Sequence, residues 1–250
     1  DEGVYTSTTD ASGIDGVGGY VFVAGRPHDV WLVSEKWPKD IQLALDAAGT
    51  TGEARARLRN EHAPMLAMPA AELFGCVAVP QVVAETLHQQ PVAIYAVGDC
   101  LPAACTLTAG VSGSAQMRTL LEAGRRLCDE WAGVAVRREH NTDADRLSHP
   151  AMALEVAKSA AEAGLMVHEA RIPPDHPVWD TLRQAAAEGL KGADNEDKIW
   201  GSLAGTKRGG FPGERSVPRR SGAARGASSG GHPPSPPRAG YRLICTILTY

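Results

Sequence analysis

Four acidic residues in this chain stand where a carboxylate could take part in metal chemistry. Asp10 and Asp99 each end a segment that is expected to be a strand. Glu72 and Asp145 lie in the first turns of segments that are expected to be helices. A carboxylate on a strand needs water, a cation or a charged partner, because burying it unpaired is costly. The four acids are therefore candidates for one shared site.

The chemistry of such a site follows from the ligand type. In an open sheet, the ends of strands and the starts of the following helices meet at one edge, so the four carboxylates are expected to converge. There they would repel one another unless hard cations lay between them. Oxygen ligands with open water positions suit Mg²⁺ or Mn²⁺. Two such ions can stabilise both the attacking and the leaving oxygen in hydrolysis of a phosphodiester.

Taken one at a time, these acids have simpler explanations. Asp10 and Asp99 suit turns, where Asp is common. Glu72 suits the positive end of a helix, and Asp143 is placed as well as Asp145 to do the same. The prediction therefore depends on all four acids occurring in order, and no single one would carry it.

Three short strands are expected first, because apolar and Thr-rich runs alternate with tight turns. The first two flank the pair Asp15-Gly16, which is a strong hairpin signal. The three segments are Gly3–Thr9, Gly18–Ala24 and Asp29–Ser34. Together they predict an antiparallel meander.

Two further strands and several helices are expected after the meander. The apolar run Pro91–Val97 is typical of a buried central strand, and Val134–Arg138 predicts another. Pro80 is expected to kink or break the helix in which it lies, and Asn141 is expected to cap one. The helical segments are one or two short helices within Pro38–Pro64, then Met68–Gln89, Ala115–Trp131 and Asn141–Ala163.

Composition limits the class of protein. The chain has 250 residues, of which 43% are hydrophobic, and this suits a globular core. It lacks an apolar window of about 18 residues, so no membrane span is expected. The five cysteines are scattered without CxxC pairs, which favours reduced thiols in an intracellular protein of the cytoplasm or nucleus. Because the sequence opens with Asp-Glu-Gly, it is expected to be a fragment of a longer protein.

Charge is distributed unevenly along the chain. Residues 200–250 carry eight Lys and Arg but one acid, a charge of +7, which leaves −11 on residues 1–199. An acidic body is not an obvious nucleic-acid binder. The segment 193–250 is rich in Gly, Pro, Ser and Arg, and is expected to be disordered. Its arginines could give weak, salt-sensitive attraction to nucleic acid, or the tail could be merely solvated.

Four sequence segments carry a family resemblance. They read "TDAS…GVGGYVF", "AAELFG", "VGDC" and "HNTDADRLSHP". In order, spacing and context they resemble the ribonuclease H domain that follows reverse transcriptase in retroelements. The last is similar to the N-x-x-A-D-x-L-S ending of DIRS-like and related elements. The resemblance covers roughly residues 4 to 160.

The resemblance implies an α/β, ribonuclease H-like fold. It has a five-stranded mixed sheet, with three antiparallel strands and then two more, flanked by helices. That domain would span residues 1–165, and a helical extension would follow at 166–192. The resemblance also implies two Mg²⁺ or Mn²⁺ ions held by catalytic acids, which by position are Asp10, Glu72, Asp99 and Asp145.

The resemblance implies specific roles for these acids. Asp10 and Asp99 would bind and bridge the metals. Glu72 would hold the ion that stabilises the leaving 3′ oxygen, and Asp145 the ion that lowers the pKa of the attacking water. His140 immediately precedes Asn141, later than the mobile histidine of cellular ribonucleases H. It either reaches the departing phosphate or is simply a loop residue.

The expected activity is cleavage of the RNA strand of an RNA/DNA hybrid, which leaves a 3′-hydroxyl and a 5′-phosphate. A reverse transcriptase domain in a longer chain would be the partner and could supply the grip on the hybrid. Two alternatives remain open. One is an integrase or exonuclease of the same fold, since fold does not fix function. The other is an inactive domain that braces a polymerase or binds a partner.

Overall fold

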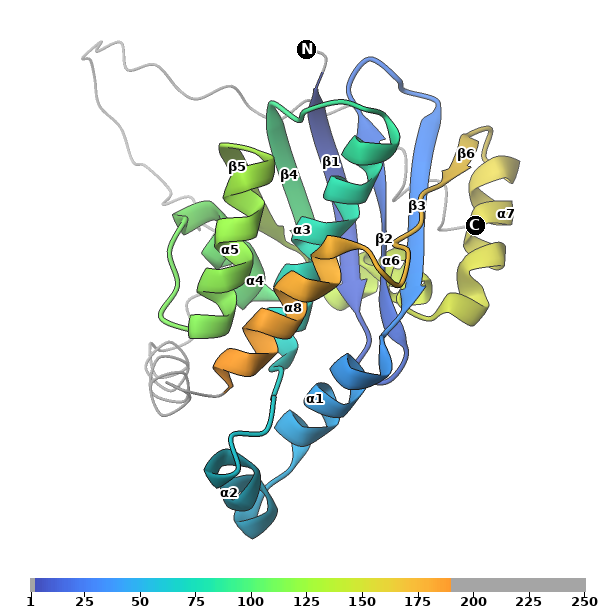
Figure 1. The fold of residues 1–250 in the computed structure, drawn as a ribbon. Coiled ribbons are helices and arrows are strands. Elements are labelled where there is room, and N and C mark those ends of the chain that lie inside the picture. The colour runs from blue at the N-terminus through green and yellow to red at the C-terminus, as the bar shows by residue number, and fades with distance from the viewer. Residues whose placement is uncertain (1–2, 190–250) are drawn as a thin grey trace, which may run out of the picture. The chain divides into compact units, whose positions relative to one another are not determined.

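The computed structural model describes residues 3–189, which form an α/β fold around one six-stranded mixed sheet (Figure 1). The strand order is β5-β4-β1-β2-β3-β6. The strands are β1 Val4–Ala11, β2 Gly16–Val23, β3 Asp29–Lys36, β4 Ala93–Gly98, β5 Glu130–Ala135 and β6 Met166–Glu169. The segment 193–250, expected to be disordered, lies outside the described residues.

The N-terminal meander is confirmed. β1 pairs antiparallel with β2, and β2 pairs antiparallel with β3. β4, the expected central strand, lies parallel to β1 on the other side, and β5 lies parallel to β4. Because β1 therefore has a strand on each side, its end is held at the centre of the sheet.

The sheet has one strand more than the five expected. β6 pairs parallel with β3 and adds a sixth strand at that edge. It comes from the segment 166–192, which was expected to be helical and in fact begins with this strand. Four residues are too few for a periodic signal, so tertiary contacts specify β6. One such contact is the stacking of His168 on Trp31, with ring centroids 4.9 Å apart.

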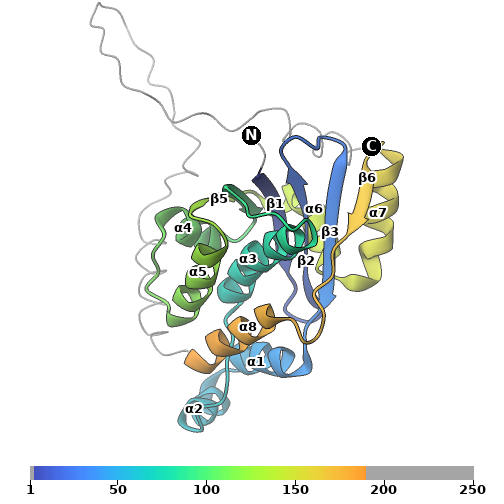
Figure 2. The same ribbon diagram turned by 45° about the horizontal axis from the view of Figure 1, so that its top comes forward.

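Helices cover both faces of the sheet. Figures 1 and 2 show α3, α5 and α8 on one face, whereas α6 lies behind β1 and β2. The α-helices are α1 Lys39–Gly49, α2 Gly52–Asn60, α3 Met68–Thr86, α4 Leu101–Ala109, α5 Ala115–Leu127, α6 Thr142–Leu147, α7 Ala153–Glu162 and α8 Pro177–Glu188. Short 3₁₀ helices are η1 Arg138–His140 and η2 Pro150–Met152. No helix within residues 3–189 is long and apolar enough to cross a membrane.

Pro80 was expected to kink or break its helix. It does not break α3, because the helix is buried along most of its length and packing outweighs one lost backbone hydrogen bond. Two other expectations about element boundaries were wrong. The single helix expected from Asn141 is divided into α6 and α7, with Pro150 at the division. β5 begins earlier than expected, since α5 ends at Leu127.

The core lies between α3 and the sheet, and α8 completes it. Phe74 of α3 and Trp179 of α8 stack with ring centroids 5.4 Å apart. Trp37 packs against both rings. The boundary expected at residue 165 falls just before β6, which joins the same sheet, and α8, which joins the same core.

Trp179→Ala is expected to lower the free energy of unfolding by about 3–5 kcal/mol, because it empties a buried aromatic site. Trp179 is 1% exposed, and its indole N–H also donates to the Pro173 carbonyl at 3.0 Å. Leu154→Ala is the control, since Leu154 is 65% exposed and should change stability by less than about 0.5 kcal/mol. Denaturant unfolding measures both. A Trp179 variant as stable as the control would show that α8 is peripheral to the fold.

Candidate metal centre

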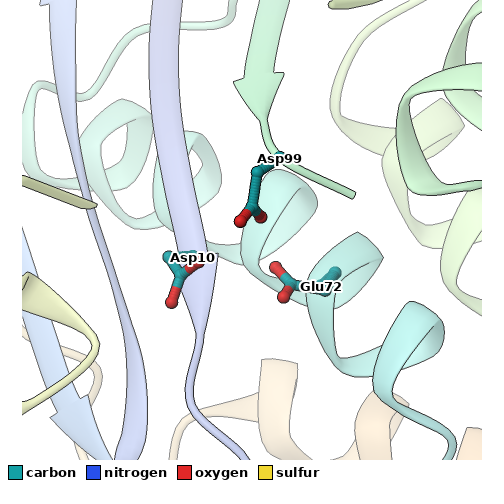
Figure 3. A group of neighbouring side chains, drawn as sticks. All are labelled: Asp10, Glu72 and Asp99. Carbon is teal, nitrogen blue, oxygen red and sulfur yellow. The ribbon is translucent and has the colours of Figure 1, made fainter. Parts of the chain in front are cut away.

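Three of the four predicted acids meet at one point. Asp10, Glu72 and Asp99 each offer a carboxylate oxygen, and these oxygens all lie within 4.8 Å of one another (Figure 3). They come from β1, from the second turn of α3 and from the residue after β4. Glu72 was expected in the first turn of its helix, but α3 begins at Met68, so its first turn contains no acid. An all-oxygen donor set this close could hold a divalent cation.

The strand register brings the two aspartates together. β1 and β4 run parallel, with Thr8 paired to Val97. Asp10 and Asp99 each lie two residues further along, where β4 has ended and β1 continues. The carboxyl ends of neighbouring parallel strands thus place both side chains at the same edge, as the sequence predicts.

Glycines allow two helices to approach this edge closely. Gly75 faces the sheet from α3, and a Cβ there would lie 3.1 Å from a Val17 methyl, so Glu72 one turn earlier is held near β1. On the other face, a Cβ on Gly18 would lie 2.2 Å from the backbone of Leu147 in α6. Gly18 is the cross-strand partner of Asp10. The glycine-rich stretch after Asp10 therefore allows α6 to pack directly against the strands at the site.

Gly18→Ala is expected to lower the free energy of unfolding by about 1–3 kcal/mol, because a rigid backbone contact must shift. Gly13→Ala is the matched control, since its Cβ would have ordinary contact with the Met68 sulfur at 3.6 Å. Thermal unfolding of the two variants makes the comparison. Equal melting temperatures would mean that α6 moves aside at little cost, and that its packing does not fix the site.

Burial and mutual repulsion shift the ionisation of the cluster. Burial, followed by the charges of Asp10 and Asp99, raises the pKa of Glu72 to about 9. Burial also raises the pKa of Asp10, against which a hydrogen bond from Ser148 acts in the opposite direction. Without a cation, Glu72 therefore keeps its proton at neutral pH. A bound cation would favour the charged form and displace that proton.

Asn141 has a different role from the one expected. It lies at the N-cap position of α6, but its side chain makes no capping hydrogen bond. Its Nδ2 instead donates to the Thr9 carbonyl at 3.1 Å and to Asp10 Oδ1 at 3.4 Å. The residue is 1% exposed, and its Oδ1 is buried with no hydrogen-bond partner among residues 3–189. Asn141 thus ties the start of α6 to the strand that bears Asp10.

Asp145, the fourth predicted acid, lies outside the three-carboxylate cluster. Its Oδ1 is 3.3 Å from Nη2 of Arg138. It is still close enough that its charge raises the pKa of Asp10. His140 lies in the exposed helix η1, between Arg138 and Asn141.

Sequence reasoning missed the site roles of three polar residues. A hydrogen bond from Ser148 lowers the pKa of Asp10. Asn141 anchors α6 to β1, and Arg138 forms an ion pair with Asp145. Asn141 and Ser148 fall within the motif "HNTDADRLSHP", so their fixed spacing from Asp145 is the signal that could have found them. Arg138 has no comparable signal, because surface arginines are common.

Comparisons with known proteins give no independent identification. No protein-family model matches this sequence, and no curated protein or solved structure is significantly similar to it. The functional interpretation therefore rests on the placement of side chains in this chain.

Proposed function

We propose that this protein is a metal-dependent nuclease with a ribonuclease H-like fold, which cleaves the RNA strand of an RNA/DNA hybrid. The observation that supports it most is the convergence of Asp10, Glu72 and Asp99 at the carboxyl ends of the two neighbouring strands β1 and β4 of a mixed sheet. Three antiparallel strands followed by parallel strands agree with the fold that the sequence motifs imply. Mg²⁺ or Mn²⁺ is the cofactor that fits these ligands.

In this proposal the acids divide between two ions. Asp10 and Asp99 would bridge the two ions, with Glu72 as a further ligand of one and Asp145 as a further ligand of the other. Two bound cations would stabilise charge on both the attacking and the leaving oxygen of a phosphodiester. The chain's own contribution is orientation, because Asn141 fixes Asp10 relative to α6 and α3 carries Glu72 to the sheet edge.

The cellular setting is also part of the proposal. The domain would act within an intracellular chain that also carries a reverse transcriptase domain. Residues 1–199 carry a charge of −11, so they are poorly suited to attract a polyanion alone. A polymerase domain would supply the phosphate contacts that give most nucleic-acid affinity.

The test is cleavage of a hybrid whose RNA strand is labelled, with Mg²⁺ or Mn²⁺ and then with excess EDTA. The proposal expects metal-dependent RNA products with 3′-hydroxyl ends, and no cleavage of the DNA strand. A circular RNA strand in the hybrid separates modes of attack, because an endonuclease opens it and an exonuclease does not. Cleavage of duplex DNA instead would favour the integrase or exonuclease alternative.

The inactive alternative is tested by metal binding alone. A domain that only braces a polymerase has no need of a cation, so it would not bind Mn²⁺ at millimolar concentrations. The acidic charge of residues 1–199 is the observation that favours this alternative. Mn²⁺ binding without any cleavage would leave the metal centre established and the nuclease proposal overturned.

A further inference from the structure

Arg138 occupies a distinctive position beside the metal centre. Its Nη2 lies 3.3 Å from Asp145 Oδ1, and Asp145 is the one predicted acid outside the three-carboxylate cluster. The guanidinium therefore neutralises the carboxylate that a second cation would need. The two cannot both occupy the same side of that carboxylate.

The backbone fixes both members of this pair. The Asn141 N–H donates to the Arg138 carbonyl, and the Asp145 N–H donates to the Asn141 carbonyl, each at 2.9 Å. Asn141 is itself anchored to the Thr9 carbonyl. Arg138 and Asp145 thus flank one buried anchor, and their proximity follows from the fold.

The chain leading to Arg138 is also held at the site. The Val136 N–H donates to the Gly98 carbonyl at 2.9 Å, next to Asp99. The backbone just before Arg138 is therefore held beside the residue that precedes Asp99.

We propose that Arg138 is a built-in counter-ion, a positioning residue that holds Asp145 until a divalent cation displaces it. This inference rests on the proposed function, because it assigns Asp145 to a second cation. It makes the two cation positions unequal. The cation at Asp10, Glu72 and Asp99 binds without competition, whereas the cation at Asp145 must displace the guanidinium.

The simpler explanation is an ordinary surface ion pair. The side chain of Arg138 is 79% exposed, and such pairs contribute little. Arg137 provides a matched control, since it is the preceding residue and pairs with Glu139 at 3.8 Å. If only the general charge mattered, loss of either arginine would change Mn²⁺ affinity equally. If Arg138 competes specifically for Asp145, only loss of Arg138 would change it.

The experiment is a Mn²⁺ titration of the metal-free chain, followed by electron paramagnetic resonance of free Mn²⁺. Wild type is expected to show two classes of site, and Asp145→Asn to lose the weaker class. Arg138→Gln is expected to tighten the weaker class about two- to fivefold, the range typical of removing one exposed ion pair. Arg138→Lys, which keeps the charge, should stay near wild type, and Arg137→Gln should have no effect.

Several results would overturn the inference. They are an unchanged or weaker second class in Arg138→Gln, an equal gain in Arg137→Gln, or a single class in wild type. Melting curves of each variant identify any that fails to fold. If Arg138→Gln fails to fold, Arg138→Lys is used in its place, and a change in its affinity for the weaker class of Mn²⁺ would overturn the inference. If wild type binds no Mn²⁺, the metal centre fails as well. If Arg138→Gln tightens binding as expected but no hybrid is cleaved, only the nuclease proposal fails.

Discussion

Asp99→Asn is expected to reduce metal-dependent cleavage of the hybrid by at least about a hundredfold. The substitution keeps the shape of the side chain but removes one of three charged ligands. Metal catalysis supplies several kcal/mol of transition-state stabilisation, and each 1.4 kcal/mol corresponds to a tenfold change in rate. Asp99 directly follows β4, so the amide should leave the sheet intact. Because Asp99 is a metal ligand in this proposal, Asp99→Asn should also weaken Mn²⁺ binding.

Two measurements make this result specific. Asp129→Asn is the matched control, since Asp129 is exposed just before β5 and should leave cleavage and Mn²⁺ binding unchanged. Without metal, the free energy of unfolding of Asp99→Asn should match or exceed that of wild type, because charge is removed from a crowded site, and that of Asp129→Asn should match wild type. If Asp99→Asn cleaves at the wild-type rate, the cluster is not the active site.

The parts of the fold that depend on local pattern could be predicted from sequence. The Asp-Gly turn and the apolar run before Gly98 are short-range signals, and they located β1, β2 and β4. The convergence of Asp10 and Asp99 followed from a general property of parallel strands. The helix does not break at Pro80, because burial of α3 is a tertiary effect that no local signal contains.

Features specified by long-range contacts could not be predicted. β6 is a four-residue strand that forms because its backbone pairs with β3 at the edge of the sheet. Helix α4 was not predicted either, and a Cβ on Gly133 of β5 would lie 2.1 Å from the Ala104 carbonyl, so one distant glycine permits its packing. Such partners are far apart in the chain.

The candidate site shows the same division. Its carboxylates could be predicted because they lie at the ends of strands or within the first two turns of helices. The partners of those carboxylates depend on side-chain direction. Asn141 suits an N-cap by type, yet its amide points to Thr9 and Asp10. Similarly, only the three-dimensional structure separates Asp145 from the other three acids and places it beside Arg138.

Glu72 is expected to make the metal-free protein less stable as pH rises. Its pKa is raised to about 9 in the folded chain from an ordinary value of 4.5. Between these values the folded state holds a proton that the unfolded state has released, so rising pH favours unfolding. Glu72→Gln imitates the protonated form at every pH. It should therefore match wild type near pH 4 and exceed its free energy of unfolding by on the order of 3–5 kcal/mol at pH 8.

The measurement is denaturant unfolding in EDTA at pH 5, 7 and 8, for wild type, Glu72→Gln and the control Glu53→Gln. Glu53 is exposed on α2, and its variant should follow wild type at each pH. The gain in Glu72→Gln should grow with pH, whereas Mn²⁺ should stabilise wild type and not this variant. The same proton links binding to pH, because the cation must displace it, so Mn²⁺ affinity of wild type should rise from pH 6 to pH 8. A Glu72→Gln variant less stable than wild type at pH 8 would mean that Glu72 is ionised and paired in the fold, and the crowded-carboxylate explanation would be wrong.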